Sequence, residues 1–318
     1  MKKLNFKKWV KTLMAVSLGL QMAPLSPAHA QDPTIKIGVL QTVEHEALDA
    51  VLKGFQDTLA DSSLKDRIEI EVQNASGDMA NLQSMAEKLS RNSDILFAIA
   101  TPAAQALATV EQEKPILIAA VTDPVEAGLA DSIEKPGRNV TGTSDLAPIN
   151  EQVDLLTRNF PDAKRVGIIY NSSEVNSVVL AELATQALND RDIQVEVGTV
   201  TSSNDIAQVM GSLVKKVDAM FMVTDNTIDS AITLVGDLAK EAKIPTIGSS
   251  DSVVRANGLA TLSNAYEDYG VQTAQMLIRM VEEDLKPADM PIEYADKLQL
   301  VVNEAFAEAL GIDPASIK

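Results

Sequence analysis

The sequence contains no cysteine among its 318 residues and only two histidines, His29 and His45. Without cysteine the chain can form no disulfide, so hydrophobic cores must hold its fold together. Cysteine nucleophiles, thiolate-ligated metals and a lipid-anchoring cysteine are excluded as well. His45 is accompanied by no G-x-S-x-G motif and no metal-ligand spacing. The sequence therefore predicts no catalytic residue and no metal site, and we expect a protein that is not an enzyme.

Positive charge is also scarce, with 27 lysine and arginine residues against 45 aspartate and glutamate residues, for a net charge of −18. A protein needs clustered cations to neutralise nucleic-acid phosphates or anionic lipid head groups. We therefore expect neither nucleic acid nor a membrane surface as a partner, and attribute the negative charge to solubility. No G-x-G-x-x-G motif follows a predicted strand, so no dinucleotide or other cofactor is expected.

The first thirty residues differ in composition from the rest of the chain. They contain five lysines and no acidic residue, then an apolar stretch over Leu13–Leu20 and the small-residue triplet Ala28-His29-Ala30. This order is typical of a secretory signal peptide, and the apolar stretch is too short to span a bilayer. We expect cleavage after Ala30, so that the mature protein begins at Gln31. The lack of a lipid-anchoring cysteine then favours a location in the periplasm.

The remaining sequence alternates short apolar runs with amphipathic stretches, in two successive series. Continuous β-branched runs of this kind are typical of strands buried on both faces of a parallel sheet. In the first series we predict strands at Ile35–Leu40, Ile68–Gln73, Ile95–Ala100 and Ile116–Val121, and helices at Glu46–Leu59, Met79–Arg91 and from Pro102. In the second we predict strands at Val166–Tyr170, Ile193–Gly198, Ala219–Val223 and Thr246–Ser249, and helices at Asn176–Asn189 and Ile228–Ala242. The predicted fold class is α/β, with two doubly wound parallel-sheet domains.

Two turn-rich segments indicate where the chain leaves each domain. Crossings near Asn139–Thr143 and Asn257–Thr261 are expected to form a multi-strand hinge, and a long helix follows at Tyr266–Glu283. A strand at Leu298–Val302 and a helix at Glu304–Leu310 come last. We therefore assign residues 31–143 and 262–290 to an N-terminal domain, and residues 144–261 and 291–318 to a C-terminal domain.

Polar side chains follow the carboxyl ends of the predicted strands in both domains. Open parallel sheets bind ligands at these ends, so we predict one ligand site there, between the domains. The candidate ligand-binding residues of the first domain are Gln41, Glu44, Thr101, Thr122 and Asp123, and those of the second are Tyr170, Asn171, Ser172, Asn176, Thr224, Asp225 and Asp251.

Some of these candidates suggest a role by their chemistry. Thr101 precedes Pro102 at a predicted helix start, where free backbone N–H groups could bind a ligand carboxylate. Asp123, Asp225 or Asp251 could accept a ligand ammonium, although each is otherwise an ordinary helix cap.

Aromatic residues make up only 3% of the chain, and its single tryptophan, Trp9, lies in the predicted signal peptide. An aromatic wall for a ligand must therefore come from phenylalanine or tyrosine. Tyr170, at a strand end, is either such a wall or a core side chain. His45 either caps the helix that begins at Glu46 or lines the cleft between the domains.

Eight short segments, spread over nearly the whole chain after residue 30, share one family resemblance. They are Val43–Asp49, Ala100–Gln105, Ala120–Val125, Lys135–Ser144, Gly167–Ser172, Asn176-Ser177, Thr224–Thr227 and Gly270–Thr273. Together they resemble the ABC transporter substrate-binding family of tryptophan/tyrosine-type uptake. The resemblance implies a type I periplasmic-binding fold with a three-strand hinge that closes on a ligand.

The same resemblance implies delivery of an amino acid, often an aromatic one, to an ABC permease in the inner membrane. We expect a monomer. Two alternatives stay open: a ligand-sensing module for a membrane receptor, and a binder of an aliphatic amino acid or another small carboxylate.

Overall fold

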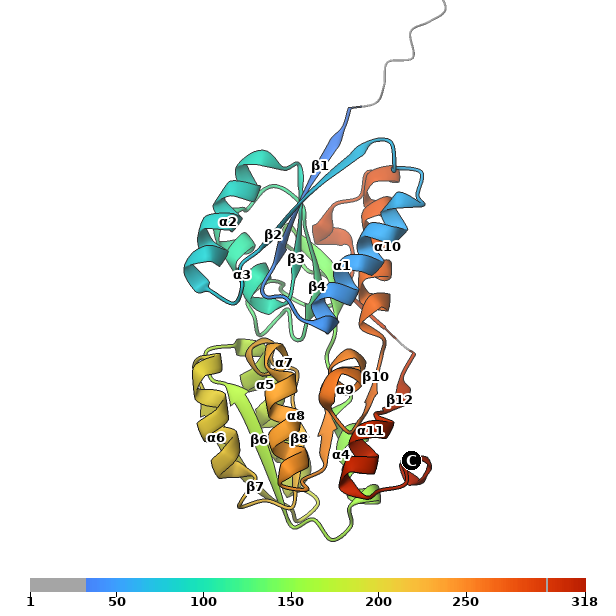
Figure 1. The fold of residues 1–318 in the computed structure, drawn as a ribbon. Coiled ribbons are helices and arrows are strands. Elements are labelled where there is room, and N and C mark those ends of the chain that lie inside the picture. The colour runs from blue at the N-terminus through green and yellow to red at the C-terminus, as the bar shows by residue number, and fades with distance from the viewer. Residues whose placement is uncertain (1–32, 296) are drawn as a thin grey trace, which may run out of the picture. The chain divides into compact units, whose positions relative to one another are not determined.

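The computed structural model describes residues 33–295 and 297–318, so the predicted signal peptide and its cleavage site lie outside the described residues. Within this part of the chain, no helix is both long and apolar enough to cross a membrane. The described residues form two lobes, each built on a six-stranded sheet with helices on its faces (Figure 1).

The first lobe has a fully parallel sheet with the strand order β11-β5-β4-β3-β1-β2. Its strands are β1 (Ile35–Gln41), β2 (Ile68–Asn74), β3 (Ile95–Ile99), β4 (Ile116–Val121), β5 (Val140–Ser144) and β11 (Glu293–Tyr294). One face carries α1 (Glu46–Ala60) and α10 (Tyr266–Glu282), and the other carries α2 (Met79–Asn92) and α3 (Thr101–Val110) (Figure 1). Because both faces are covered, β3 and β4 are buried along their whole length, which explains their continuous apolar sequences.

Helices α1 and α10 lie against each other although more than two hundred residues separate them in sequence. Glycines stand where the two backbones meet. A Cβ atom on Gly270 would collide with the carbonyl oxygen of Val51, and one on Gly54 would collide with that of Glu267. The close approach fixes α10 in the first lobe after the chain has passed through the second.

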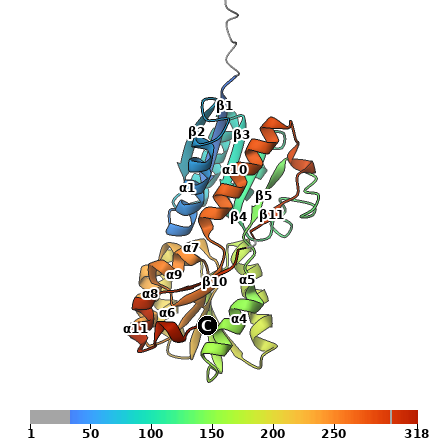
Figure 2. The same ribbon diagram turned by 90° about the vertical axis from the view of Figure 1, so that its right-hand side faces the viewer.

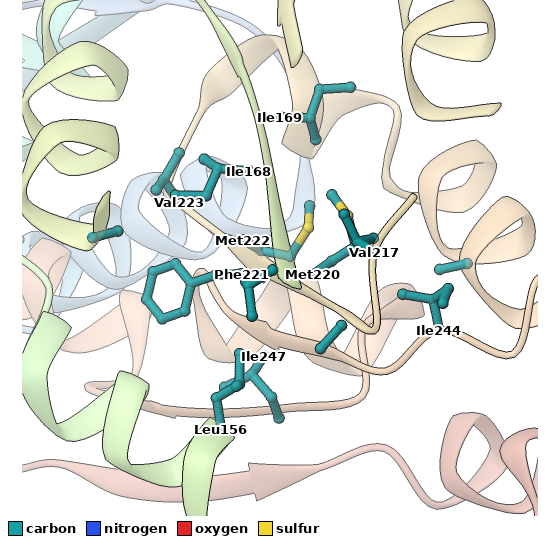
Figure 3. Packing of buried hydrophobic residues seen from close by; sticks show 14 of the residues in the cluster. Leu156, Ile168, Ile169, Val217, Met220, Phe221, Met222, Val223, Ile244 and Ile247 are labelled. Atoms are coloured by element: carbon teal, nitrogen blue, oxygen red, sulfur yellow. The ribbon is translucent and has the colours of Figure 1, made fainter. Parts of the chain in front are cut away.

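The second lobe repeats the architecture with the strand order β12-β10-β9-β8-β6-β7, in which only β12 is antiparallel to its neighbour. Its strands are β6 (Arg165–Asn171), β7 (Gln194–Val200), β8 (Ala219–Met222), β9 (Thr246–Gly248), β10 (Ala260–Ser263) and β12 (Gln299–Val302). Its helices are α4 (Ile149–Asn159), α5 (Val175–Asn189), α6 (Ile206–Leu213), α7 (Asn226–Ser230), α8 (Ile232–Glu241), α9 (Asp251–Asn257) and α11 (Glu304–Leu310). Figure 3 shows part of its core, where Leu156 of α4 lies near Phe221 of β8 and Ile247 of β9. The predicted α/β class with two doubly wound sheets is confirmed.

The predicted continuous helix Ile228–Ala242 is wrong, because the structure has two helices, α7 and α8, in this region. The Asp225 carboxyl accepts a hydrogen bond from the backbone N–H of Ile228, so helix formation already starts at Asn226. The backbone then leaves helical geometry at Ala231, where φ is −111° and ψ is 20°.

The segments Asn139–Thr143 and Asn257–Thr261, near which crossings were predicted, overlap the strand that precedes each crossing. The first segment runs into β5, which pairs with β4 and β11, and the second leads into β10, which pairs with β9 and β12. Each turn-rich segment thus ends in a strand that completes the sheet of its own lobe. The chain crosses between the lobes after β5, after β10 and again between β11 and β12 (Figure 2). Strand β11 lies in the first sheet, although it follows the predicted boundary at residue 290.

Candidate ligand-binding site

A pocket of about 290 Å³ opens between the two lobes, at the carboxyl ends of their strands. The first lobe contributes Thr42 and Pro102 to its wall, and the second contributes Asn171, Glu174 and Asn226. Most of the other lining residues are serines, threonines and amides. The pocket therefore lies where open parallel sheets bind ligands, and its walls offer many hydrogen-bonding groups.

Four polar side chains at strand ends or crossings have buried atoms without a hydrogen-bond partner among the described residues. These atoms are Oγ1 of Thr101, Oδ1 of Asn176, Oδ1 of Asn264 and both ring nitrogens of His45. An unsatisfied buried polar atom costs roughly 1–3 kcal/mol, so native proteins rarely leave several together. None of these four residues is among those that line the pocket of about 290 Å³.

The backbone is strained at the same strand ends. Ala100 after β3, Ala120 near the end of β4 and Ser249 after β9 have φ values of 77°, 55° and 58°. Residues with a Cβ atom rarely adopt positive φ, and each such residue costs of order 1–3 kcal/mol. Strain of this kind is concentrated at ligand sites, where it aims polar groups that an unstrained chain would direct elsewhere.

Two buried carboxyls stand at the start of α7. Asp225 caps this helix and also accepts from the backbone N–H of Asn171 at 2.5 Å. Glu174 accepts from the backbone N–H groups of Asn226 at 3.2 Å and Thr227 at 3.1 Å. Neither carboxyl forms an ion pair with a lysine or arginine of the described chain. Burial, and secondly the charge of Glu174, raise the pKa of Asp225 to about 7, so a ligand cation would be stabilised here.

A third carboxyl lies deeper in the same lobe. Asp229 is almost completely buried, and the Ser249 hydroxyl lies 3.2 Å and 3.3 Å from its two oxygens. Burial, together with the charge of Asp225, raises the pKa of Asp229 well above its usual value. The carboxyl ends of β8 and β9 thus carry an excess of buried acidic groups.

Buried side chains also join the crossings to one another. Asp145, in the first crossing, accepts from the phenol of Tyr266 at 2.5 Å and from the hydroxyl of Thr122 at 3.2 Å. Asn264, in the second crossing, donates to the carbonyl of Ala295 in the third at 3.2 Å. Burial raises the pKa of Asp145. The three crossings are therefore held as one unit by polar contacts.

The five predicted residues of the first lobe fall into different environments. Thr101 and Thr122 are buried at the ends of β3 and β4. Gln41 is buried too, but its amide donates within its own segment. Asp123 is half-buried and accepts from two backbone N–H groups of the following turn, as a cap does. Glu44 is exposed.

Four of the predicted residues of the second lobe are brought together in two pairs. Asn171 donates to Asp225 through its backbone, and the Asn176 side chain donates to the Thr224 carbonyl at 3.3 Å. Ser172 is exposed and donates to a backbone carbonyl of the β7 end.

Asp251 and Tyr170 lie apart from these pairs. Asp251 accepts from the backbone N–H of Tyr266 at 3.2 Å, so it is linked to the crossings. Tyr170 lines a separate pocket with Ala181, Thr185 and other residues of α5 and with Val197 of β7. It does not contribute to the pocket between the lobes.

Sequence reasoning missed Glu174, Asp145 and Tyr266. Glu174 lies in the polar stretch that follows β6. A correct prediction that α7 starts at Asn226 would have shown free backbone N–H groups there, to which the Glu174 carboxyl binds. Asp145 and Tyr266 flank crossings that the sequence prediction placed several residues too early. Their hydrogen bond joins positions 121 residues apart, a separation that no local pattern reports.

His45 does not cap α1, because its side chain forms no capping hydrogen bond. Its ring instead lies near Asn226 of the second lobe. Of the two roles considered for it, the structure therefore favours the position in the cleft.

Comparison with known proteins gives a consistent result. A model of the ABC transporter substrate binding protein family matches residues 36–315. A tyrosine-binding protein of Clostridioides difficile (strain R20291) is 38% identical over 283 residues, which is 88% of this chain and 82% of that protein.

Two solved structures are similar to the chain at nearly the same identity. An ABC domain from Streptococcus pneumonia in complex with L-Trp is 38% identical, with a TM-score of 0.84 over 87% of this chain and 95% of that one. The ligand-free, open structure of a substrate binding protein with adhesive properties from Clostridium difficile is 39% identical, with a TM-score of 0.68 over 89% and 97%. The type I periplasmic-binding fold is thereby confirmed.

Proposed function

Because the chain belongs to the ABC transporter substrate binding protein family, we propose that it binds an aromatic amino acid between its lobes and presents it to an ABC permease. The support for the ligand class comes from the relatives, one named for tyrosine and one solved with L-Trp. The protein then acts by binding and release and performs no catalysis. Export by the predicted signal peptide would bring it to the membrane face from which an importer draws its substrate.

The observation that carries the proposal is the set of unpartnered polar atoms at opposing strand ends. The Thr101 hydroxyl stands at the first turn of α3, where helix N–H groups and the helix dipole favour a carboxylate. In the second lobe, Asn176 offers an acceptor and Asp225 a negative charge, which suit an ammonium. An amino acid zwitterion matches both ends at once.

We propose the aromatic wall of the site from the positions of the phenylalanines and tyrosines relative to the crossings. Phe55 and Phe97 stack on each other in the core of the first lobe, at 4.1 Å between ring centroids. Phe160, Phe221, Phe306 and Tyr170 pack in or against the core of the second lobe, and Tyr294 is exposed. Tyr266 and Tyr269 are also buried in the core of the first lobe, in edge-to-face contact at 5.3 Å, but the Tyr266 phenol reaches Asp145 in the first crossing. We assign the aromatic contact with the ligand side chain to Tyr266.

A fluorescence titration tests the ligand class directly. Protein cleaved after Ala30 contains no tryptophan, so added L-tryptophan is the only indole in the sample. Its emission is expected to shift to shorter wavelength as the indole leaves water for the closed cleft. Thermal unfolding with L-Trp, L-Tyr, L-Phe and L-Leu provides the comparison, because a tight ligand raises the melting temperature by mass action. If the emission does not shift and no aromatic amino acid raises the melting temperature, the proposed ligand class is wrong.

A further inference from the structure

His45 belongs to the first lobe but is enclosed by the second. It directly precedes α1, whereas Asn226, at the start of α7, approaches its ring from the other lobe. Helix α9 of the second lobe packs on α1 beside it. Both ring nitrogens are buried, and neither completes a hydrogen bond within the described residues. His45 is also the one histidine of residues 33–318.

This enclosure exists only while the lobes are together. The open, ligand-free relative fits the chain less well than the L-Trp complex does, so lobe separation is available to the family. When the lobes separate, the ring returns to water and recovers an ordinary pKa near 6.5. When they close, an imidazolium would be buried with only Asn226 to compensate, which is unfavourable.

We propose that His45 makes lobe closure sensitive to protons: the lobes close on the ligand around a neutral imidazole, and protonation of His45 favours opening and ligand release. This inference rests on the proposed function, because it concerns the same closure. Under this proposal, ligand release depends on the pH as well as on the ligand concentration.

The surrounding charges could oppose this effect, since most of them are negative. They are Glu44, Glu46 and Asp49 on the segment of His45; Glu174, Asp225 and Asp229 around α7; Asp251 and Arg255 on α9; and Glu267 and Asp268 on α10. The buried members already have donors of their own: Asn226 and Thr227 bind Glu174, and Asn171 binds Asp225. Desolvation therefore dominates at His45 and lowers its pKa to about 4, against a smaller upward effect of Asn226.

The pKa of His45 in the open and closed forms determines the direction in which pH changes lobe closure. A base whose pKa is lower in the closed form stabilises closure above its open-state pKa of 6.5, and this contribution is lost as the pH falls below that value. Between about pH 7.5 and about pH 5.5, ligand affinity should fall about tenfold. Asp225 titrates in the same range and is the proposed partner of the ligand ammonium, so its protonation also weakens binding as the pH falls. The effect of His45 is therefore the difference between proteins with and without the imidazole.

The test compares the wild type with His45→Gln and with Glu46→Gln, a matched control that removes an exposed ionisable group from the next position. Calorimetric titrations with L-tryptophan and L-tyrosine are carried out at about pH 7.5, 6.5 and 5.5. Thermal unfolding without ligand confirms that each variant is folded at each pH. Between about pH 7.5 and about pH 5.5, the wild type and Glu46→Gln should both lose about tenfold more affinity than His45→Gln does.

Two results would overturn the inference while leaving the proposed function intact. In one, His45→Gln keeps the wild-type pH dependence. In the other, the wild type binds more tightly at low pH, because the carboxyls around the ring stabilise the imidazolium. A wild type that binds neither amino acid at about pH 7.5 contradicts the proposed function, and with it this inference.

Discussion

The two lobes differ most at one pair of corresponding strand ends, where the first lobe has a buried hydroxyl and the second a buried carboxyl. Strands β3 and β8 occupy the same place in the two strand orders, yet Thr101 follows the first and Asp225 comes after the second. Strands β4 and β9 correspond in the same way, and each carries a strained residue near its end, Ala120 and Ser249. One backbone design thus recurs with opposite electrostatics.

Under the proposed function, this difference would let two similar lobes bind the two ends of one zwitterion. The first lobe offers a helix start and a free hydroxyl, which suit a carboxylate. The second offers buried acidic groups without a lysine or arginine partner in the described chain, which suit an ammonium. Neither lobe alone can satisfy both charges, so the ligand gains most when the lobes meet.

Neutralising the acidic side should have the largest effect on binding. In Asp225→Asn the side chain keeps its shape and one acceptor oxygen but loses its charge. Removing one partner of a buried charge pair costs roughly 3–5 kcal/mol, or about two to four decades of affinity. Calorimetry with L-tryptophan measures the loss, and Asp123→Asn, at a half-buried cap of the other lobe, serves as the control. A loss below about tenfold in Asp225→Asn would assign the ammonium to another group.

Removing the hydroxyl side should weaken binding less. In Thr101→Val the unpartnered hydroxyl is replaced by a methyl group, and a hydrogen bond to a charged group contributes about 1.5–3 kcal/mol. We expect affinity to fall about ten- to a hundredfold, while the ligand-free protein stays as stable as the wild type. Thr109→Val is the matched control, because Thr109 lies on the same helix with its hydroxyl bonded to the Gln105 carbonyl. Equal affinities of the two variants would contradict a role for Thr101.

The buried carboxyls should also make the thermal stability of the ligand-free protein depend on pH. Asp225 has a raised pKa of about 7, so its proton stabilises the fold at low pH, and this stability is lost as the pH rises through about 7. Asp145 and Asp229 act in the same direction. Thermal unfolding should therefore show a melting temperature that falls by several degrees between about pH 5 and about pH 8. Asp225→Asn should flatten this dependence, and curves parallel to the wild type would argue against the buried charge.

Much of the fold could be predicted because it depends on local patterns. Ile95–Ala100 and Ile116–Val121 are continuous apolar runs, and both became buried central strands. The helix break at Ala231 was not predicted because no glycine or proline marks it in the sequence. The exact crossings were not predicted, because turn residues indicate where the chain changes direction and do not indicate which sheet the next strand joins.

The candidate site was predictable only in part. Thr101, Asn176 and Asp225 could be identified because they follow predicted strands or begin a predicted helix. Asp145 and Tyr266 could not, since their importance lies in a contact between two distant crossings. Tyr170 satisfies the strand-end pattern equally well, but its ring points to a pocket beside α5. Position along the strand thus predicts the end of the sheet, while the face that a side chain occupies depends on tertiary packing.

Tyr170 and Tyr266 provide the last comparison. Replacing Tyr170 should leave the affinity for L-tryptophan almost unchanged, whereas replacing Tyr266 should lower it. Tyr170→Leu removes a ring that is half-buried against the second core, so we expect L-tryptophan affinity to change less than about twofold. Tyr266→Leu removes the aromatic contact assigned to the ligand and leaves Asp145 with only Thr122 as a side-chain donor. It should weaken binding about tenfold or more, because an aromatic pair contributes about 0.5–1.5 kcal/mol beyond its buried area. Tyr266→Phe separates the two losses, since it keeps the ring and removes only the bond to Asp145. If Tyr170→Leu weakened binding as much as Tyr266→Leu, the ligand would have to contact β6, and the aromatic wall would belong to the second lobe.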